Sequence, residues 1–166
     1  MVLSAVADIK LAIIGCGNTN RSDDGVGPHV VAELRTRDLP GGAKLFDGGT
    51  DGMGVMYQAK GATHLIIIDA RAPEDQPGAI YEVPGEILAA PPPQSLNLHD
   101  FRWDHALYAG KKIYGDSFPK HVKVFLIEAE NLELGLELSS AVQSSVARIA
   151  SRIEALAAAG TAGAWS

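Results

Sequence analysis

The sequence predicts one α/β domain of three layers, in which a twisted, mostly parallel sheet of about five strands has helices on both faces. Short apolar runs, such as those within residues 9–15 and 64–70, are typical of strands that are buried on both faces, as parallel sheets require. These runs alternate along the chain with segments of helical period. Strands that alternate with helices favour a parallel sheet with right-handed crossovers.

The size and charge of the chain limit the number of domains it can form and the kinds of partner it can bind. Its 166 residues, 46% of them hydrophobic, are enough for one core, so residues 1–166 are expected to form a single domain, with a core of about 9–158 and a flexible tail at 159–166. A net charge of −6 with scattered basic residues argues against nucleic-acid binding. No apolar run reaches the length of a membrane span, no basic segment precedes the first apolar residues, and there is a single cysteine. These features predict a cytoplasmic protein that does not bind membranes.

The individual elements follow from local patterns. Strands are expected at residues 9–15, 43–49, 64–70, 79–84 and 122–130. Helices are expected from Val26, over residues 52–61 and 103–111, and from Ser140, where Gln143 would complete a capping box. Three consecutive prolines and the lack of any period predict an irregular loop at residues 85–99, and long loops in compact domains are often functional.

Acidic residues follow three of the expected strands. Asp23 and Asp24 come after the first strand, Asp47 and Asp69 end the second and third, and His99 lies in the loop after the fourth. Ligands collect at the carboxyl ends of parallel strands, so these side chains should converge on one edge. Two carboxylates roughly 4 Å apart repel by about 4 kcal/mol at an effective dielectric of about 20, so they need a shared proton or a cation. Two carboxylates and an imidazole therefore predict a site for a divalent transition metal.

Each of these residues also has a purely structural interpretation. One of the paired aspartates, Asp23 or Asp24, would cap the following helix. Asp47, before two glycines, would be a turn residue, and Asp69 would cap a loop. His99 would be a surface residue, and His105 competes with it for any role.

The glycine turn raises the question of a nucleotide site. Gly15 and Gly17 match the first two glycines of the dinucleotide-binding motif, but Asn20 replaces the third, and the acidic pair would repel a pyrophosphate. Cys16 is interpreted as a small apolar residue packed under the turn, and Trp103 as a packing residue. The turn is therefore expected to receive a cation rather than an anion.

Four segments together resemble a known family. These segments are IIGCGNTNRSDDGVGPHVV, FDGGTDGM, HLIIIDA and LNLHDFRWDHALYAG. In order and spacing they resemble the nickel-iron hydrogenase maturation endopeptidases, which trim the C-terminus of the hydrogenase large subunit. The resemblance runs from about residue 9 to the final helix. It implies a peptide hydrolase that acts as a monomer on one partner, the nickel-loaded large-subunit precursor.

The resemblance also implies roles for individual residues. The residues implied to ligate the metal and to act in catalysis are Asp24, Asp69 and His99. Those implied to bind substrate are Asp47, Gly48 and Gly49. The metal would be the nickel already inserted in the client, for which other divalent ions can substitute, so no obligatory cofactor is expected. Three O and N ligands do not select nickel by affinity, so selectivity would come from how the client presents the metal.

Two departures from the family pattern limit what it implies. The usual Ser-x-His is replaced by SLNLH, and His105 stands where the family has an Asp. The segment LIEAENLELGLELS lacks the usual Gly-Ile-Gln-Pro. These changes leave the client uncertain, although they favour an uptake-type hydrogenase. The alternatives are a metal-dependent binding module or chaperone for the same large subunit that does not cut it, and a nucleotide-binding α/β protein.

Overall fold

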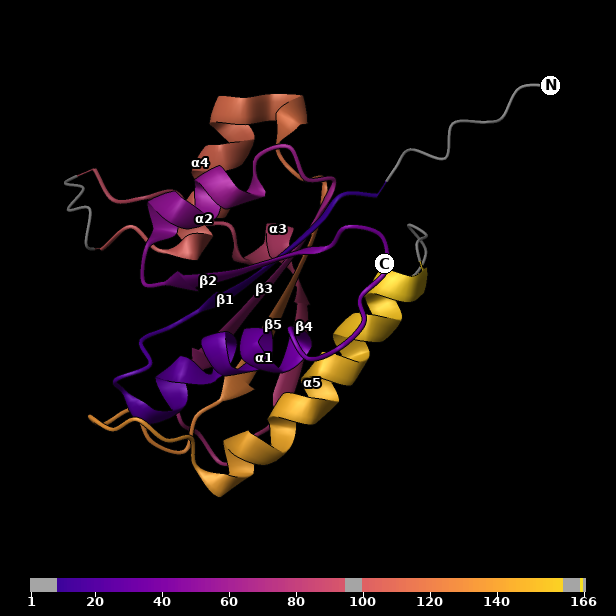
Figure 1. The fold of residues 1–166 in the computed structure, drawn as a ribbon. Coiled ribbons are helices and arrows are strands. Elements are labelled where there is room, and N and C mark those ends of the chain that lie inside the picture. The colour runs from indigo at the N-terminus through magenta and orange to yellow at the C-terminus, as the bar shows by residue number, and fades with distance from the viewer. Residues whose placement is uncertain (1–8, 95–99, 160–164, 166) are drawn as a thin grey trace.

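The computed structural model describes residues 9–94, 100–159 and 165, and its centre is a five-stranded sheet (Figure 1). The strands are β1 (Leu11–Cys16), β2 (Lys44–Gly49), β3 (His64–Arg71), β4 (Ile80–Pro84) and β5 (His121–Glu128). Their order across the sheet is β2-β1-β3-β5-β4, and only β4 runs antiparallel to its neighbour. The prediction of a mostly parallel sheet of about five strands is confirmed.

Helices cover both faces of this sheet. They are α1 (Val26–Leu34), α2 (Gly52–Ala59), α3 (Gly85–Leu88), α4 (Trp103–Tyr114) and α5 (Ser140–Ala159), with short 3-10 helices η1 (Ser22–Gly25) and η3 (Gly115–Ser117). Helices α1 and α5 lie on one face, and α2 and α4 lie on the other (Figure 1). Alternate residues of each strand point to opposite faces, so Ile13 packs with α1 and α5 while Ile14 packs with α2 and α4. The three-layer prediction is therefore also confirmed.

The structure differs from the sequence-based expectations at a loop, at the start of α5 and at the C-terminal tail. The loop expected at residues 85–99 begins with a one-turn helix, α3, while residues 95–99 lie outside the described part. The hydroxyl oxygen that faces the start of α5 belongs to Ser139, which accepts from the N–H of Val142 at 3.4 Å. The predicted capping box of Ser140 and Gln143 is therefore wrong: Ser139 is the cap, and Val142 has no side-chain acceptor to complete a box. Within the expected tail, Ala159 ends α5 and Trp165 packs against the face that carries α1 and α5.

Among the helices in the described ranges, none has the length and apolar character needed to cross a membrane. The carboxyl ends of β1, β2 and β3 lie side by side because these strands are parallel neighbours. The loops that leave these three strands therefore meet at one edge of the sheet.

Candidate functional site

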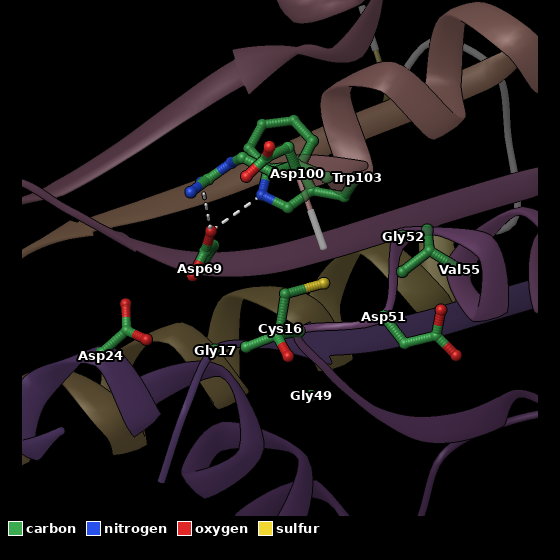
Figure 2. Close-up of a pocket in the computed structure, with 12 residues that line it drawn as sticks. Cys16, Gly17, Asp24, Gly49, Asp51, Gly52, Val55, Asp69, Asp100 and Trp103 are labelled. Carbon is green, nitrogen blue, oxygen red and sulfur yellow. Dashed lines mark hydrogen bonds and ion pairs between the residues drawn. The ribbon is translucent and has the colours of Figure 1, made fainter. Parts of the chain in front are cut away.

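A cleft of about 310 Å³ opens at this carboxyl edge (Figure 2). Its lining comes from the ends of β1, β2 and β3 and the turns after them, from α2, and from the start of α4 with the residues before it. The lining residues are Cys16, Gly17, Asp24, Gly49, Thr50, Asp51, Gly52, Val55, Asp69, Asp100, Arg102 and Trp103. Four of these residues are aspartates and only one is basic. The cleft is therefore acidic, as the sequence predicts for this edge.

The turn after β1 brings Asp24 to the cleft. Gly17 has a φ of 129°, and a Cβ at this position would overlap the backbone carbonyl oxygen of Asp24, so only glycine fits. The Oδ2 atom of Asp24 then accepts a hydrogen bond from the N–H of Asn18 at 2.8 Å. Asp24 is half-buried and lines the cleft, so its carboxylate keeps open positions for a ligand.

Asp69 reaches the same cleft from β3 and is only 4% exposed. Its Oδ1 accepts from the N–H of Ala70 at 2.8 Å, and its Oδ2 accepts from the indole Nε1 of Trp103 at 2.8 Å. Burial raises the pKa of Asp69 to about 6; the hydrogen bonds from Trp103 and Ala70 act against this shift, and nearby Asp24 adds to it. Asp69 therefore loses its proton only as the pH rises through about 6, just below neutrality.

The segment before α4 forms the opposite wall. A Cβ on Gly52 would overlap the carbonyl oxygen of Phe101, so this glycine lets the chain pass close to the start of α2. That approach places Trp103 at hydrogen-bonding distance from Asp69 and the Arg102 guanidinium 3.5 Å from Oδ2 of Asp69. The Arg102 side chain is 62% exposed, so this ion pair is weak.

Sequence reasoning missed the role of this wall. Trp103 is buried, as expected of a packing residue, but it also donates a hydrogen bond to Asp69, 34 residues away in sequence. The chemistry of tryptophan could have indicated this hydrogen bond. A buried indole N–H usually has an acceptor, so the prediction of a buried Trp103 already implied a polar partner.

The two aspartates of the turn have separate roles. Asp23 is fully buried, and its carboxylate accepts from the N–H groups of Glu130, Asn131 and Ser139 and from the Ser139 hydroxyl, at 2.7 to 3.2 Å. Helix α1 begins after Gly25 without any side-chain cap. The interpretation of Asp23 or Asp24 as a cap of this helix is therefore wrong, because Asp23 holds a distant loop and Asp24 faces the cleft.

Of the remaining predicted residues that the structure describes, one lines the cleft and two do not. Gly49 lines it, whereas Asp47 is exposed and its Oδ1 accepts from the N–H of Gly49 at 3.0 Å, which is the geometry of a turn residue. Gly48 packs against Ile14 beneath the strand end. His99, the third predicted metal ligand, lies outside the described residues.

Two further side chains have simple local roles. The Nδ1 atom of His105 accepts from the N–H of Arg102 at 3.2 Å, so His105 helps to close the first turn of α4. Cys16 is 4% exposed, and burial raises the pKa of its thiol well above the ordinary value. The thiol is therefore neutral at physiological pH, which fits its interpretation as a packing residue.

Metal binding depends on how many ligands converge. Over residues 9–94, 100–159 and 165, no three His, Cys, Asp or Glu side chains form a group that could hold a metal ion. Asp24 and Asp69 supply a pair of carboxylates in one cleft. Structural metal sites commonly have four ligands, which these two carboxylates alone do not supply.

The fold and the cleft define an α/β protein with an acidic ligand site at the carboxyl edge of a parallel sheet. Residues 28–156 match the family model of the hydrogenase maturation proteases. The chain therefore belongs to the hydrogenase maturation protease family, and it is a peptide hydrolase.

Relatives and solved structures agree with this assignment. The chain is 28% identical over 145 residues to the hydrogenase 2 maturation protease of Escherichia coli K12, and the aligned region covers 83% of this chain and 84% of the relative. The solved hydrogenase maturating endopeptidase HybD of E. coli is similar at a TM-score of 0.75 and 25% identity, over 92% of this chain and 94% of that one. A [NiFe] hydrogenase maturation protease from Thermococcus kodakarensis KOD1 shares the fold, with a TM-score of 0.68 at 15% identity, over 91% and 94% of the two chains.

Proposed function

We propose that this protease removes the C-terminal extension from the nickel-loaded large-subunit precursor of a nickel-iron hydrogenase, and that Asp24, Asp69 and His99 contact the bound nickel. The observation that carries the proposal is the convergence of Asp24 and Asp69, from two different strand ends, on one open cleft. Family membership supports the reaction, and the acidic cleft supports a cationic ligand.

Electrostatics favour a cation between these carboxylates. Burial is the main cause of the raised pKa of Asp69, and the charge of Asp24 raises it further, which means that the two negative charges oppose each other. A divalent ion would reverse that opposition and favour the ionised form of both side chains. Trp103 and Ala70 each direct a hydrogen bond at Asp69 and so fix its orientation before any ligand arrives.

The client is the proposed source of the metal. Oxygen and nitrogen ligands bind Cu²⁺ and Zn²⁺ as well as Ni²⁺, so this cleft cannot select nickel by its chemistry. Nickel held by the precursor would instead bring its own coordination shell, and the protease would complete it. The peptide tail would then lie in the cleft beside the metal, where a carbonyl could be polarised or a water oriented.

The decisive experiment compares nickel-loaded and nickel-free precursor by intact mass after incubation with the protease. We expect the wild-type chain to shorten only the loaded precursor, even after the protease alone has been dialysed against a chelator. Asp24→Asn and Asp69→Asn should lose processing. Asp116→Asn, at an aspartate with a 99% exposed side chain, should process normally and serves as the matched control.

Two results would contradict the proposal. An unchanged precursor mass together with saturable binding would indicate a binding module that does not cut. Tight stoichiometric metal in the purified chain, with activity lost on chelation and restored by zinc, would indicate a conventional metalloprotease.

A further inference from the structure

The loop between β5 and α5 contacts the turn after β1, and its residues do not line the cleft described above. This β5–α5 loop, residues 129–139, lies beside the turn after β1 that carries Asp24 (Figure 1). Gly135 forms an isolated bridge with Arg21: the N–H of Gly135 donates to the carbonyl of Asn20 at 2.9 Å, and the N–H of Ser22 donates to the carbonyl of Gly135 at 2.8 Å. The middle of the β5–α5 loop is therefore held against the turn that carries Asp24, at the same carboxyl edge of the sheet as the cleft.

The rest of the loop is held by buried groups. The Asp23 carboxylate accepts four hydrogen bonds from the loop, and the Ser22 hydroxyl donates to the carbonyl of Glu133 at 2.8 Å. Ser22 has a φ of 52°, in the left-handed region that non-glycine residues rarely adopt. Such a conformation persists only where the surroundings determine it strongly, so the two loops form one rigid unit.

This rigid loop presents two large apolar side chains to solvent. Leu134 and Leu136, on either side of the bridged Gly135, are 79% and 72% exposed, whereas Leu138 packs into the core. A single exposed leucine is ordinary on a protein surface. A pair on a fixed backbone is different, because the ordering that binding would otherwise require has already occurred.

The charge around the leucines indicates the kind of partner. Glu130, Glu133 and Glu137 are all exposed, residues 129–139 contain no Lys or Arg, and the exposed Arg21 that pairs with Gly135 offsets only part of this negative charge. A complementary surface would offer an apolar hollow flanked by basic side chains. Because the loop is hydrogen-bonded to the turn that carries Asp24, a partner bound here could insert a tail of its own chain between Asp24 and Asp69.

We infer that Leu134 and Leu136 are a docking surface for the folded body of the client protein, whose C-terminal tail enters the cleft. This inference rests on the proposed function, since it assigns the occupant as the same large-subunit precursor. It adds that recognition is divided: the loop binds the folded client, and the carboxylates meet the metal and the tail. Docking through the loop then does not require nickel.

The test is the double variant Leu134→Ser/Leu136→Ser, with Ile113→Ser as the matched control. Ile113 is 64% exposed on α4, so the control removes a similar apolar side chain elsewhere on the surface. Losing the burial of two leucines should raise the Kd for nickel-free precursor by roughly tenfold to a hundredfold. The KM for nickel-loaded precursor should rise similarly while kcat at saturation stays within about twofold of wild type, and Ile113→Ser should change neither.

The charged rim gives an independent readout. Glu133→Lys/Glu137→Lys should slow association with the precursor, and the difference from wild type should shrink as salt is added, because exposed charges act mainly on the association rate. The unfolding midpoints of all variants should match the wild type. An altered midpoint would be followed by the single variants Leu134→Ser and Leu136→Ser, each of which should still weaken binding.

The outcomes separate the docking inference from the proposed function. Wild-type chain that binds the precursor through the leucines but never shortens it would leave docking intact and refute the proteolysis. Normal cleavage with an unchanged KM and Kd in the double variant would refute docking alone. Docking would also be wrong if the double variant lowered kcat without changing KM, or if sedimentation showed that the leucines join two copies of this chain.

Discussion

Asp23 and Asp24 are adjacent in sequence, yet the structure predicts opposite consequences when each is changed to Ala. Asp23→Ala removes a fully buried acceptor and leaves three backbone N–H groups and one hydroxyl without their partner. A buried donor left unpaired costs about 1–3 kcal/mol, and water that enters the vacated space satisfies some of the four. We therefore expect Asp23→Ala to lower the free energy of unfolding by about 3–5 kcal/mol.

Replacing the neighbouring Asp24 should hardly change the free energy of unfolding. Asp24 is half-buried and accepts one hydrogen bond, from the N–H of Asn18, and removing its charge also relieves its opposition to Asp69. We expect Asp24→Ala to change the free energy of unfolding by no more than about 1 kcal/mol. Asp23→Asn should fall between the two, because the amide keeps one acceptor oxygen.

Equilibrium unfolding in guanidinium chloride at pH 7, followed by far-ultraviolet circular dichroism, measures all three variants. Native domains have only about 5–15 kcal/mol of stability, so the loss in Asp23→Ala would remove a large part of it. If Asp23→Ala unfolded within about 1 kcal/mol of wild type, the β5–α5 loop would not depend on the buried carboxylate. If Asp24→Ala were the more damaging of the two, the roles assigned to the pair would be reversed.

Two further predictions concern titratable groups in the cleft. The folded pKa of Asp69, about 6, lies above its ordinary value of 3.8, so the folded state binds more protons between about pH 4 and 6. Its contribution to stability therefore falls as pH rises through that window, by about 3 kcal/mol in order of magnitude, and unfolding measured from pH 4 to 7 should show a flatter profile for Asp69→Asn. An identical pH profile in wild type and Asp69→Asn would contradict the raised pKa. The raised pKa of the Cys16 thiol predicts that iodoacetamide at pH 8 modifies the chain, measured by intact mass, only after unfolding; rapid alkylation of the native protein would refute it.

The sheet and the approach of Asp24 and Asp69 were predictable because they depend on short patterns and on one geometric rule. An apolar run such as the one within residues 64–70 is typical of a central strand buried on both faces, and β3 occupies that place. Parallel neighbours end at the same edge, so Asp24 and Asp69 had to approach each other once β1 and β3 were adjacent.

The contacts that the sequence did not reveal are those made between loops. The donors to Asp23 lie 107 to 116 residues away, and Trp103 lies 34 residues from Asp69. Which buried polar groups meet depends on how each loop lies, and neither periodicity nor propensity determines that arrangement. Helix ends show the same limit at a smaller scale, because Ser139 and Ser140 are chemically identical candidates for the cap of α5.

The position of Asp69 connects the stability of the fold to the proposed function. Its burial makes the ionised carboxylate unfavourable in the folded chain near neutral pH, although hydrogen bonds from Trp103 and Ala70 reduce that penalty. On the proposed function, nickel carried by the precursor would compensate the charge, and the stability removed by burial would be recovered as affinity for the loaded client. An unloaded precursor lacks this gain and can use only the β5–α5 loop. Docking by Leu134 and Leu136 would then bring the two proteins together, and the charge at Asp69 would decide whether the tail is held for cutting.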